Sequence, residues 1–234
     1  MPLLVFEGPE GCGKTTQLRM LSEWVVARAP TTRHASHPAR DTGVKPSPLV
    51  VAVREPGGTP LGDQIRRLLL DPASDIAPRA ESLLFMASRA QLVEREIQPA
   101  LEGGAIVLVD RFFLSTYAYQ VAGRGLPHEE IVAANRLATG VLRPDLTILL
   151  SFPVEEGLAR AAKRGGRDRM EQEDGAFHDR VARAFTDFAT KEWQSAHPEA
   201  GPVESVDARG TTREVFTRVL TVLHQRWPDT FLPS

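Results

Sequence analysis

One glycine-rich stretch, FEGPEGCGKTT at residues 6–16, constrains this chain more than any other, and it directly follows a short apolar run. Gly8, Gly13, Lys14 and Thr15 stand in it with the spacing G-x-x-x-x-G-K-T. Between a strand and a helix, such a stretch leaves backbone N–H groups able to surround a phosphate, because no Cβ blocks their approach. It therefore predicts a phosphate-binding loop that joins a strand over 3–6 to a helix over 13–28.

The residue types in this loop indicate a nucleoside triphosphate and a metal ion. Lys14 would balance charge on the β- and γ-phosphate oxygens, and Thr15 would offer its hydroxyl to Mg²⁺. A turn that only joins a strand to a helix is the alternative, but it would not need a lysine and a threonine here. Cys12 is interpreted as a small spacer, since phosphoryl transfer needs no thiol. The predicted ATP-binding positions are Gly8, Gly11, Cys12, Gly13, Lys14, Thr15 and Thr16.

Short runs rich in Val, Leu and Ile recur along the chain and have the length of strands. They lie at 3–6, 49–53, 105–109, 146–151 and 203–207. Helix-patterned segments separate them, at about 13–28, 60–70, 79–102, 114–141, 154–164, 176–195 and 211–227. This alternation predicts an α/β fold in three layers, with a doubly wound parallel sheet of five strands. In such a sheet, ligands bind beyond the carboxyl ends of the strands.

Length and composition indicate one domain over residues 1–234, with no repeat or break that suggests a second. The formal net charge of −2 gives no general attraction to nucleic acid or to acidic membranes. No apolar stretch approaches the roughly 20 residues of a membrane helix, and a single cysteine fits a reducing interior. We expect a cytoplasmic protein without nucleic-acid or membrane partners.

Residues 30–48 contain four prolines and almost no large apolar side chain, which predicts a mobile surface loop. His34 and His37 in this segment are interpreted as solvated histidines rather than metal ligands, because no carboxylate or cysteine cluster accompanies them.

Two further strand ends carry charged residues. Arg54 precedes a Pro-Gly-Gly turn and a helix, which suggests a second anion site, although a solvated arginine beside an ordinary turn is the alternative. Asp110 and Arg111 follow the third apolar run. There, an acid can hold Mg²⁺ through water, and an arginine can clamp a phosphate. Two anion sites and one metal indicate a phosphotransferase acting between two phosphorylated partners.

Six motifs resemble, in order and spacing, those of bacterial-type thymidylate kinases: EGPEGCGKTT, REPGGTPLGDQIR, LLFMASRAQ, DRFFLSTYAYQ, RPDLTILL and KRGGRDRMEQE. REPGGT together with DR-x-x-x-S-T-x-A-Y-Q is the most specific part, and the D-G-F-P-R-type segment of adenylate kinases is absent from the sequence. The resemblance covers most of the chain. It implies a P-loop nucleoside monophosphate kinase fold, a homodimer, and transfer of the ATP γ-phosphoryl group to dTMP with Mg²⁺, giving dTDP and ADP.

The resemblance also implies roles for individual residues. Arg54 and Arg111 would hold the dTMP phosphate, Phe85 would stack on thymine, and Arg89 would bind its O4 edge. From the residues alone, Phe85 is better interpreted as a core residue, and Arg89 could equally be a solvated helix charge. Tyr117 is interpreted as packing. The other residues implied around the acceptor are Glu10, Thr116, Tyr119 and Gln120.

The segment 160–175 is rich in Arg and Lys and contains the pair Gly165-Gly166. It predicts a lid over ATP, with a solvated charged face as the alternative. In one branch of the family that the sequence resembles, an arginine of the phosphate loop stabilises the transferred phosphoryl group. Positions 9–12 carry no cation here, so the resemblance implies that the lid would supply it. Arg164 is the first choice, and Arg160 is expected beside ATP. The predicted catalytic residues are Lys14, Arg164, Arg111 and Glu10.

Two other functions stay open at the level of sequence. A kinase for another nucleoside or nucleoside monophosphate would share the phosphate loop and the lid. A regulatory P-loop ATPase would share the phosphate loop alone.

Overall fold

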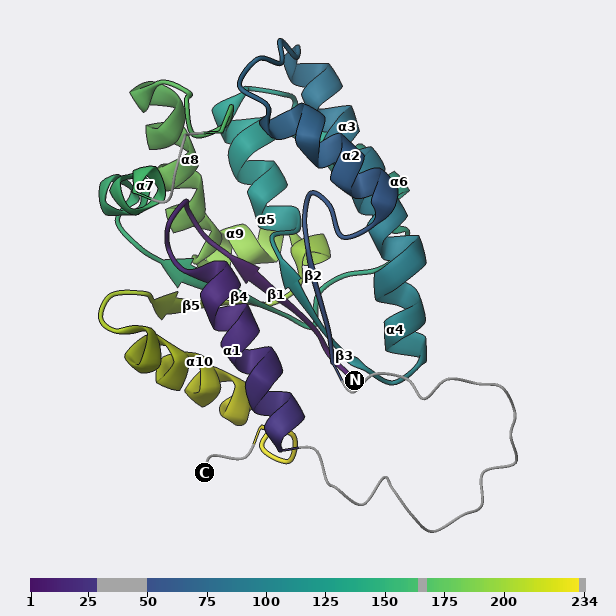
Figure 1. The fold of residues 1–234 in the computed structure, drawn as a ribbon, viewed down its shortest axis with the longest axis vertical. Coiled ribbons are helices and arrows are strands. Elements are labelled where there is room, and N and C mark those ends of the chain that lie inside the picture. The colour runs from purple at the N-terminus through teal and green to yellow at the C-terminus, as the bar shows by residue number, and fades with distance from the viewer. Residues whose placement is uncertain (29–49, 164–167, 232–234) are drawn as a thin grey trace.

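A computed structural model describes residues 1–28, 50–163 and 168–231 of the chain. The expected loop at 30–48 and the lid residues Arg164, Gly165, Gly166 and Arg167 lie outside these ranges. Five parallel strands form one sheet in the order β2-β3-β1-β4-β5, which confirms the predicted doubly wound α/β fold (Figure 1). The strands are β1 (Leu3–Glu7), β2 (Val50–Arg54), β3 (Ile106–Asp110), β4 (Leu146–Ser151) and β5 (Val203–Asp207).

The central strands β1 and β3 are buried along their whole length, as expected for a parallel sheet covered on both faces. Side chains alternate between the faces, so Leu3 and Val5 join one hydrophobic core while Leu4 and Phe6 join the other. A nearly continuous apolar run is therefore what this strand position requires.

One face of the sheet carries α1 (Lys14–Ala27) and α10 (Thr212–Arg226), which also pack against each other (Figure 1). A reciprocal hydrogen-bonded cap between Thr211 and Glu214 starts α10. Trp227 packs beside this core, and its ring centroid lies 6.1 Å from that of Phe231.

The opposite face is covered by helices from the middle of the chain. These are α3 (Pro78–Leu92), η2 (Val93–Ile97), α4 (Gln98–Glu102), α5 (Phe113–Thr116), η3 (Tyr117–Gly123) and α8 (Gly175–Phe188). The other helices pack outside this layer or connect its parts: α2 (Pro60–Leu70), α6 (His128–Thr139), α7 (Val154–Ala162), α9 (Lys191–Ala196) and η4 (Pro198–Ala200). Both α2 and α6 pack against α3.

Three expected helices differ in the structure. The segment 79–102 continues as a helix but passes through the π-helical turn η2. The segment 114–141 is divided, because Gly125 adopts a left-handed φ of 71° and Pro127 precedes a new helix. The segment 176–195 is divided at Thr190, whose side chain accepts a hydrogen bond from the Trp193 N–H and caps α9. Among the described residues, no helix is long and apolar enough to cross a membrane.

Candidate active site

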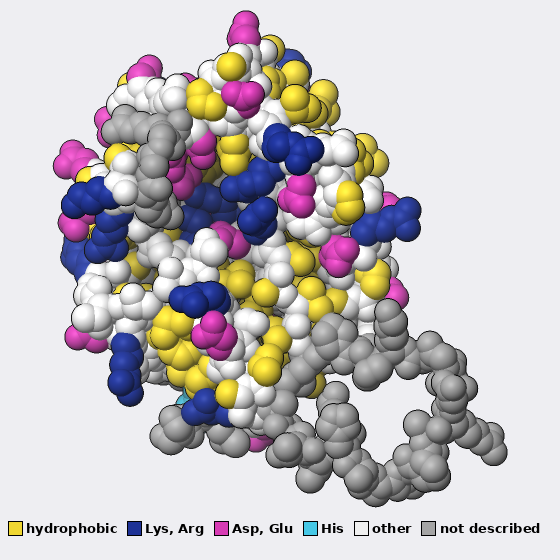
Figure 2. Space-filling model, viewed as in Figure 1, with side chains coloured by type: hydrophobic (Ala, Val, Ile, Leu, Met, Phe, Trp, Pro, Cys, Tyr) yellow, Lys and Arg dark blue, Asp and Glu magenta, His cyan; other side chains and the backbone are white. Residues whose placement is uncertain are grey.

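The carboxyl ends of β1, β2 and β3 meet at a cavity of about 420 Å³. Figure 2 shows Lys and Arg side chains gathered in a hollow between the start of α1 and α2. The cavity is lined by Glu10, Gly11, Gly13, Lys14, Thr15, Thr16, Arg54, Glu55, Arg66, Asp110, Arg111, Asp168 and Glu171. The sequence-predicted phosphate loop and the predicted second anion site thus share one cavity.

Three glycines of the loop adopt positive φ angles: 138° at Gly8, 66° at Gly11 and 99° at Gly13. A Cβ at Gly8 would lie 2.5 Å from the carbonyl oxygen of Leu150, so the loop also needs glycine there for space. At Gly13, the same Cβ would meet nothing within 4 Å, because this glycine faces the cavity. The loop therefore presents bare backbone toward the cavity and packs closely against the protein behind it.

The loop also contacts α7 through its backbone. A Cβ on Gly11 would lie 2.1 Å from the carbonyl oxygen of Gly157, and a Cβ on Gly157 would lie 2.1 Å from that of Glu10. Two glycines, one on each side, are what allow the loop and α7 to approach this closely.

Lys14 and Thr15 occupy the start of α1, at the edge of the cavity. The Nζ of Lys14 donates to the carbonyl oxygens of Gly8 at 2.9 Å and Pro9 at 2.8 Å, so the ammonium group lies over the loop. The Thr15 hydroxyl donates to Oδ2 of Asp110 at 2.5 Å. This contact brings together the two residues that the sequence predicts for Mg²⁺.

Arg111 joins the phosphate loop to the turn after β3. Its Nη2 donates to Oε1 of Glu10 at 2.6 Å, and Nη1 donates to Oγ of Ser115 at 2.9 Å. Burial alone would lower the pKa of Arg111, but Glu10 and the other nearby negative groups raise it by more. The pKa therefore lies well above its ordinary value, and the guanidinium stays charged. Its φ of 70° costs about 1–3 kcal/mol for a residue other than glycine. The side-chain hydrogen bonds help to hold Arg111 in this backbone conformation.

Tyr119 donates its hydroxyl to the same Oε1 of Glu10 at 2.9 Å. Burial raises the pKa of the phenol well above its ordinary value, and the Glu10 carboxylate raises it further. Tyr119 therefore acts as a neutral hydrogen-bond donor beside the cavity.

Glu7, which the sequence analysis missed, fixes the turn that carries Arg111. It is fully buried at the end of β1 and accepts hydrogen bonds from the Phe112 N–H at 2.7 Å and from Ser115 N–H and hydroxyl at 2.9 and 2.6 Å. A carboxylate in a buried apolar strand was the only signal of this role in the sequence.

Arg54 and Arg66 face the cavity from β2 and α2. The Arg54 side chain is 59% exposed, and its Nη2 lies 3.7 Å from Asp63. Arg66, also absent from the predicted site, donates to the carbonyl oxygen of Pro56 at 2.9 Å. Burial lowers the pKa of Arg66, and the charges of Arg54 and Arg111 lower it further. Three guanidinium groups thus repel one another across a small space, which an anion would relieve.

Arg89 lies deeper, buried behind the cavity in an ion pair with Glu55. Its Nε and Nη2 donate to Glu55 at 2.8 and 2.5 Å, Nη2 also donates to the carbonyl of Phe112 at 2.8 Å, and Nη1 donates to Asn135. These partners use four of the five guanidinium N–H groups, so one N–H on Nη1 has no hydrogen-bond acceptor among the described residues. Arg89 is not a solvated helix charge.

The remaining predicted acceptor residues lie on α3, α5 and η3 and are not among the described residues that line the 420 Å³ cavity. Phe85 is half-buried and belongs to neither hydrophobic core of the described chain. Thr116 and Gln120 are buried, and Nε2 of Gln120 donates to Glu81 at 3.1 Å. Tyr117 packs in the core, as expected. Their contacts with a nucleotide stay a prediction.

Glu81 anchors Arg169 of the predicted lid. It is fully buried at the start of α3 and accepts hydrogen bonds from Arg124 at 2.8 Å and Arg169 at 2.6 Å. Burial alone would raise the pKa of Glu81, but the two arginines outweigh it and lower the pKa. Asp168, next to Arg169, is thereby positioned at the cavity.

Arg160 on α7 lines a separate cavity of about 240 Å³ on the other side of the phosphate loop. Its guanidinium lies 4.0 Å from the ring centroid of Phe152. Gly11, Gly13 and Thr16 line both cavities, so the loop lies between them.

Comparison with known proteins gives this site a family. The family model described as Thymidylate kinase matches residues 44–209. A thymidylate kinase of Trichodesmium erythraeum is 42% identical over 226 residues, which cover 95% of both chains. A thymidylate kinase of Deinococcus radiodurans is 47% identical over 191 residues, which cover 82% of this chain and 84% of the relative.

A solved structure agrees with these relatives. The crystal structure of thymidylate kinase from Ehrlichia chaffeensis matches with a TM-score of 0.69 at 29% identity, covering 95% of this chain and 98% of that one. The similarity therefore extends over more of the chain than the family-model match. By sequence and by fold, the chain belongs to the thymidylate kinase family.

Proposed function

We propose that this protein transfers the γ-phosphoryl group of ATP to dTMP, giving dTDP and ADP. One observation carries the proposal: a phosphate loop and a group of guanidiniums face the same 420 Å³ cavity from different strands. Phosphoryl transfer is catalysed mainly by positioning and charge stabilisation, so a cavity that holds two phosphorylated molecules is its main requirement.

The ATP side would be the loop and the start of α1. Backbone N–H groups of Gly11 and Gly13 and the ammonium of Lys14 would surround the phosphates, with the helix N-terminus adding its dipole. The 240 Å³ cavity beside Arg160 has room for the part of ATP that extends away from the transferred group. Arg160 would contact the nucleotide there.

The acceptor side would be formed by Arg54, Arg66 and Arg111, which favour a dianionic phosphate. Glu10 and Tyr119 would border the sugar, and half-buried Phe85 would stack on thymine. The N–H group that remains on Arg89 would bind the O4 atom of the base. No general base is required, since a phosphate monoester with a second pKa near 6 is already mostly ionised at neutral pH.

Thr15 and Asp110 would hold Mg²⁺. Their oxygens lie 2.5 Å apart at the cavity edge, and hydroxyl and carboxylate oxygens are the donors that this hard cation prefers. Bound Mg²⁺ would neutralise charge on the ATP phosphates. Lys14, and Arg164 from the lid, would add the positive charge that the transferred group requires.

The oligomeric state is part of the proposal. Large apolar side chains are exposed on three helices that pack side by side, with Leu61 and Leu68 on α2, Leu83 on α3, and Leu137 on α6 (Figure 1). We propose that a homodimer covers them, since exposed apolar patches mark interaction sites. One domain and a cytoplasmic location complete the proposal.

A panel of phosphate acceptors tests the function. ADP release with Mg-ATP would be measured for dTMP, dUMP, dCMP, dGMP and AMP, and without acceptor. We expect the highest kcat/KM with dTMP and almost no turnover without acceptor. A strong preference for a base other than thymine or uracil would identify a different nucleotide kinase. Rapid turnover that no acceptor changes would identify a regulatory ATPase.

A further inference from the structure

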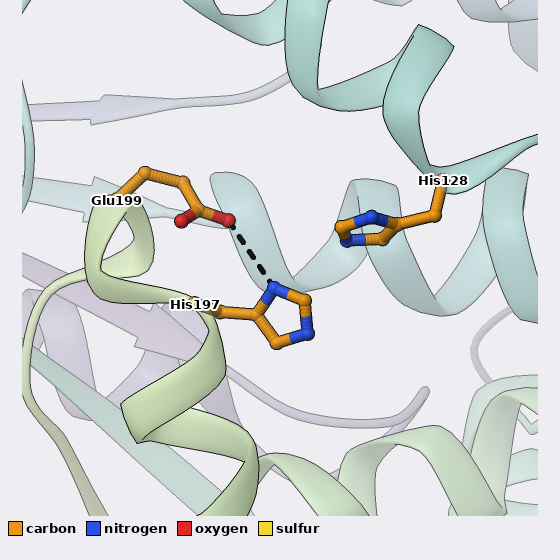
Figure 3. A group of neighbouring side chains, drawn as sticks. All are labelled: His128, His197 and Glu199. Carbon is orange, nitrogen blue, oxygen red and sulfur yellow. Dashed lines mark ion pairs between the residues drawn. The ribbon is translucent and has the colours of Figure 1, made fainter.

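A second group of ligating side chains lies outside the cavity described above: His128, His197 and Glu199. His128 is the first residue of α6, His197 ends α9, and Glu199 lies in η4. Figure 3 shows the two imidazoles and the carboxylate pointing into a common space between these segments. One ligand atom from each residue lies within 4.8 Å of the other two.

Neighbouring side chains orient all three residues. The Tyr117 hydroxyl donates to Oε1 of Glu199 at 2.7 Å. The His128 ring stacks on Tyr117 with centroids 5.3 Å apart, and the His197 ring lies 4.2 Å from the ring of Trp193. Metal-binding carboxylates and imidazoles are commonly held in place by such outer contacts.

We propose that His128, His197 and Glu199 bind a divalent transition-metal cation of the Zn²⁺ class. Two imidazoles and one carboxylate are a donor set that suits Zn²⁺, whereas Mg²⁺ prefers oxygen donors alone. Tetrahedral ligands at Zn²⁺ lie about 3.3 Å apart, so the cluster needs a small contraction from its present spacing. His128 is exposed and can make this movement, and water can take the fourth position.

The ligands come from two segments that are distant in the sequence, because His128 lies at the start of α6 whereas His197 and Glu199 lie at the end of α9 and in η4. The bound ion would connect the start of α6 to the α9–η4 segment and so stabilise the folded chain.

The competing explanation is a purely structural cluster. His197 Nδ1 lies 3.4 Å from Oε1 of Glu199, which is an ion pair if the imidazole is protonated. The His128 and His197 rings pack on one another, with centroids 4.7 Å apart. Such a cluster would need no metal. It predicts no stoichiometric binding and no dependence of the melting temperature on added Zn²⁺.

The test uses the full-length enzyme after chelator treatment and dialysis. Zn²⁺ affinity would be measured by competition with a chromophoric chelator, and Co²⁺ would be added separately to record ligand-field absorption. We expect one equivalent bound, a tetrahedral or five-coordinate Co²⁺ spectrum, and a melting temperature that rises with Zn²⁺. His128→Gln and Glu199→Gln should each weaken binding at least about 100-fold, and Tyr117→Phe about 10-fold.

Two controls keep the result specific to this cluster. His224→Gln changes a histidine on α10 and should leave binding unchanged. A His34→Gln/His37→Gln double variant tests the histidines outside the described residues, and it too should bind normally. The dTMP kinase activity of His128→Gln would confirm folding. The proposal is overturned if binding is not stoichiometric, if His128→Gln and Glu199→Gln bind like the parent, or if the double variant abolishes binding.

Discussion

The Nη2 atom of Arg111 lies 2.6 Å from Oε1 of Glu10, and this contact connects the phosphate loop to the turn after β3. The pair balances its own charge within the protein. Arg54 has only a looser contact, 3.7 Å to Asp63, and Arg66 donates to a neutral carbonyl group. Of the three guanidinium groups that line the cavity, Arg54 and Arg66 thus have the looser charge pairing, and this difference guides the first prediction.

Arg54→Ala is expected to raise KM for dTMP at least about 10-fold, because a charge-assisted contact with the acceptor phosphate is worth roughly 1.5–3 kcal/mol. KM for ATP and the melting temperature should change little, since the side chain is 59% exposed. Steady-state kinetics with each substrate varied in turn checks this. Arg67→Ala is the matched control, because Arg67 is an exposed arginine on α2 that is not among the described residues lining the cavity. An unchanged KM for dTMP would remove Arg54 from the acceptor site.

Arg164→Ala is expected to lower kcat by about 10³ or more while leaving the affinity for dTMP nearly intact. The reason is chemical: a lid cation acts on charge that develops during transfer, and positions 9–12 of the phosphate loop provide none. Single-turnover kinetics would separate transfer from product release. Lys163→Ala, at the neighbouring exposed position, is the control. If Arg164→Ala keeps turnover within a few-fold of the parent, another lid arginine has this role.

Glu7→Gln is expected to lower kcat/KM for dTMP while leaving KM for ATP nearly unchanged. The Gln side chain can accept at only one of the two positions where Glu7 accepts, so the turn that carries Arg111 loses part of its support. We expect a loss of about 10- to 100-fold, in line with supporting residues elsewhere. Glu23→Gln, at an exposed position of α1, is the control. Equal losses for both substrates would instead indicate a general loss of folding.

Glu81→Gln is expected to lower the melting temperature by at least about 5 °C at pH 7. It leaves Arg124 and Arg169 without their buried partner, which costs roughly 3–5 kcal/mol. Glu130→Gln breaks an exposed ion pair with Arg79 and should cost less than about 1 kcal/mol. Thermal unfolding followed by circular dichroism compares the two variants.

The same Glu81 variant has a predicted pH dependence. Because the folded protein lowers the pKa of Glu81, the carboxylate stabilises the fold fully above the ordinary pKa of a glutamate, about 4.3. That stabilisation is lost as the pH falls through the lowered pKa. The gap in melting temperature between parent and variant should therefore stay constant above about pH 5.5 and narrow below pH 4. A gap that is unchanged down to the acid limit of folding would contradict the charged role of Glu81.

The sheet and the phosphate loop could be predicted from sequence because their signals are local. Buried parallel strands require apolar runs, and the loop between Gly8 and Thr15 requires its glycines and lysine within a few positions. The structure confirms the sheet and the position of the loop between β1 and α1. Gly125 and Thr190 divide two expected helices, because a left-handed turn and a side-chain cap outweigh a helical pattern of apolar residues.

The support of the site could not be predicted in this way, because it depends on contacts between distant parts of the chain. Glu7 accepts hydrogen bonds from a turn more than 100 residues later in the sequence. Glu55 pairs with Arg89, and Glu81 pairs with Arg169, across similarly separate elements. A carboxylate in an apolar segment indicates that some partner exists, but the partner is known only once the chain is folded.

The glycine contact between Gly11 and Gly157 has a mechanical consequence. The two main chains meet there with no side chain between them, so the position of the loop and the position of α7 depend directly on each other. Since α7 precedes the lid segment in the chain, this backbone contact joins the loop proposed to hold ATP to the helix from which the lid begins. A methyl group added to either glycine would therefore push the loop and α7 apart.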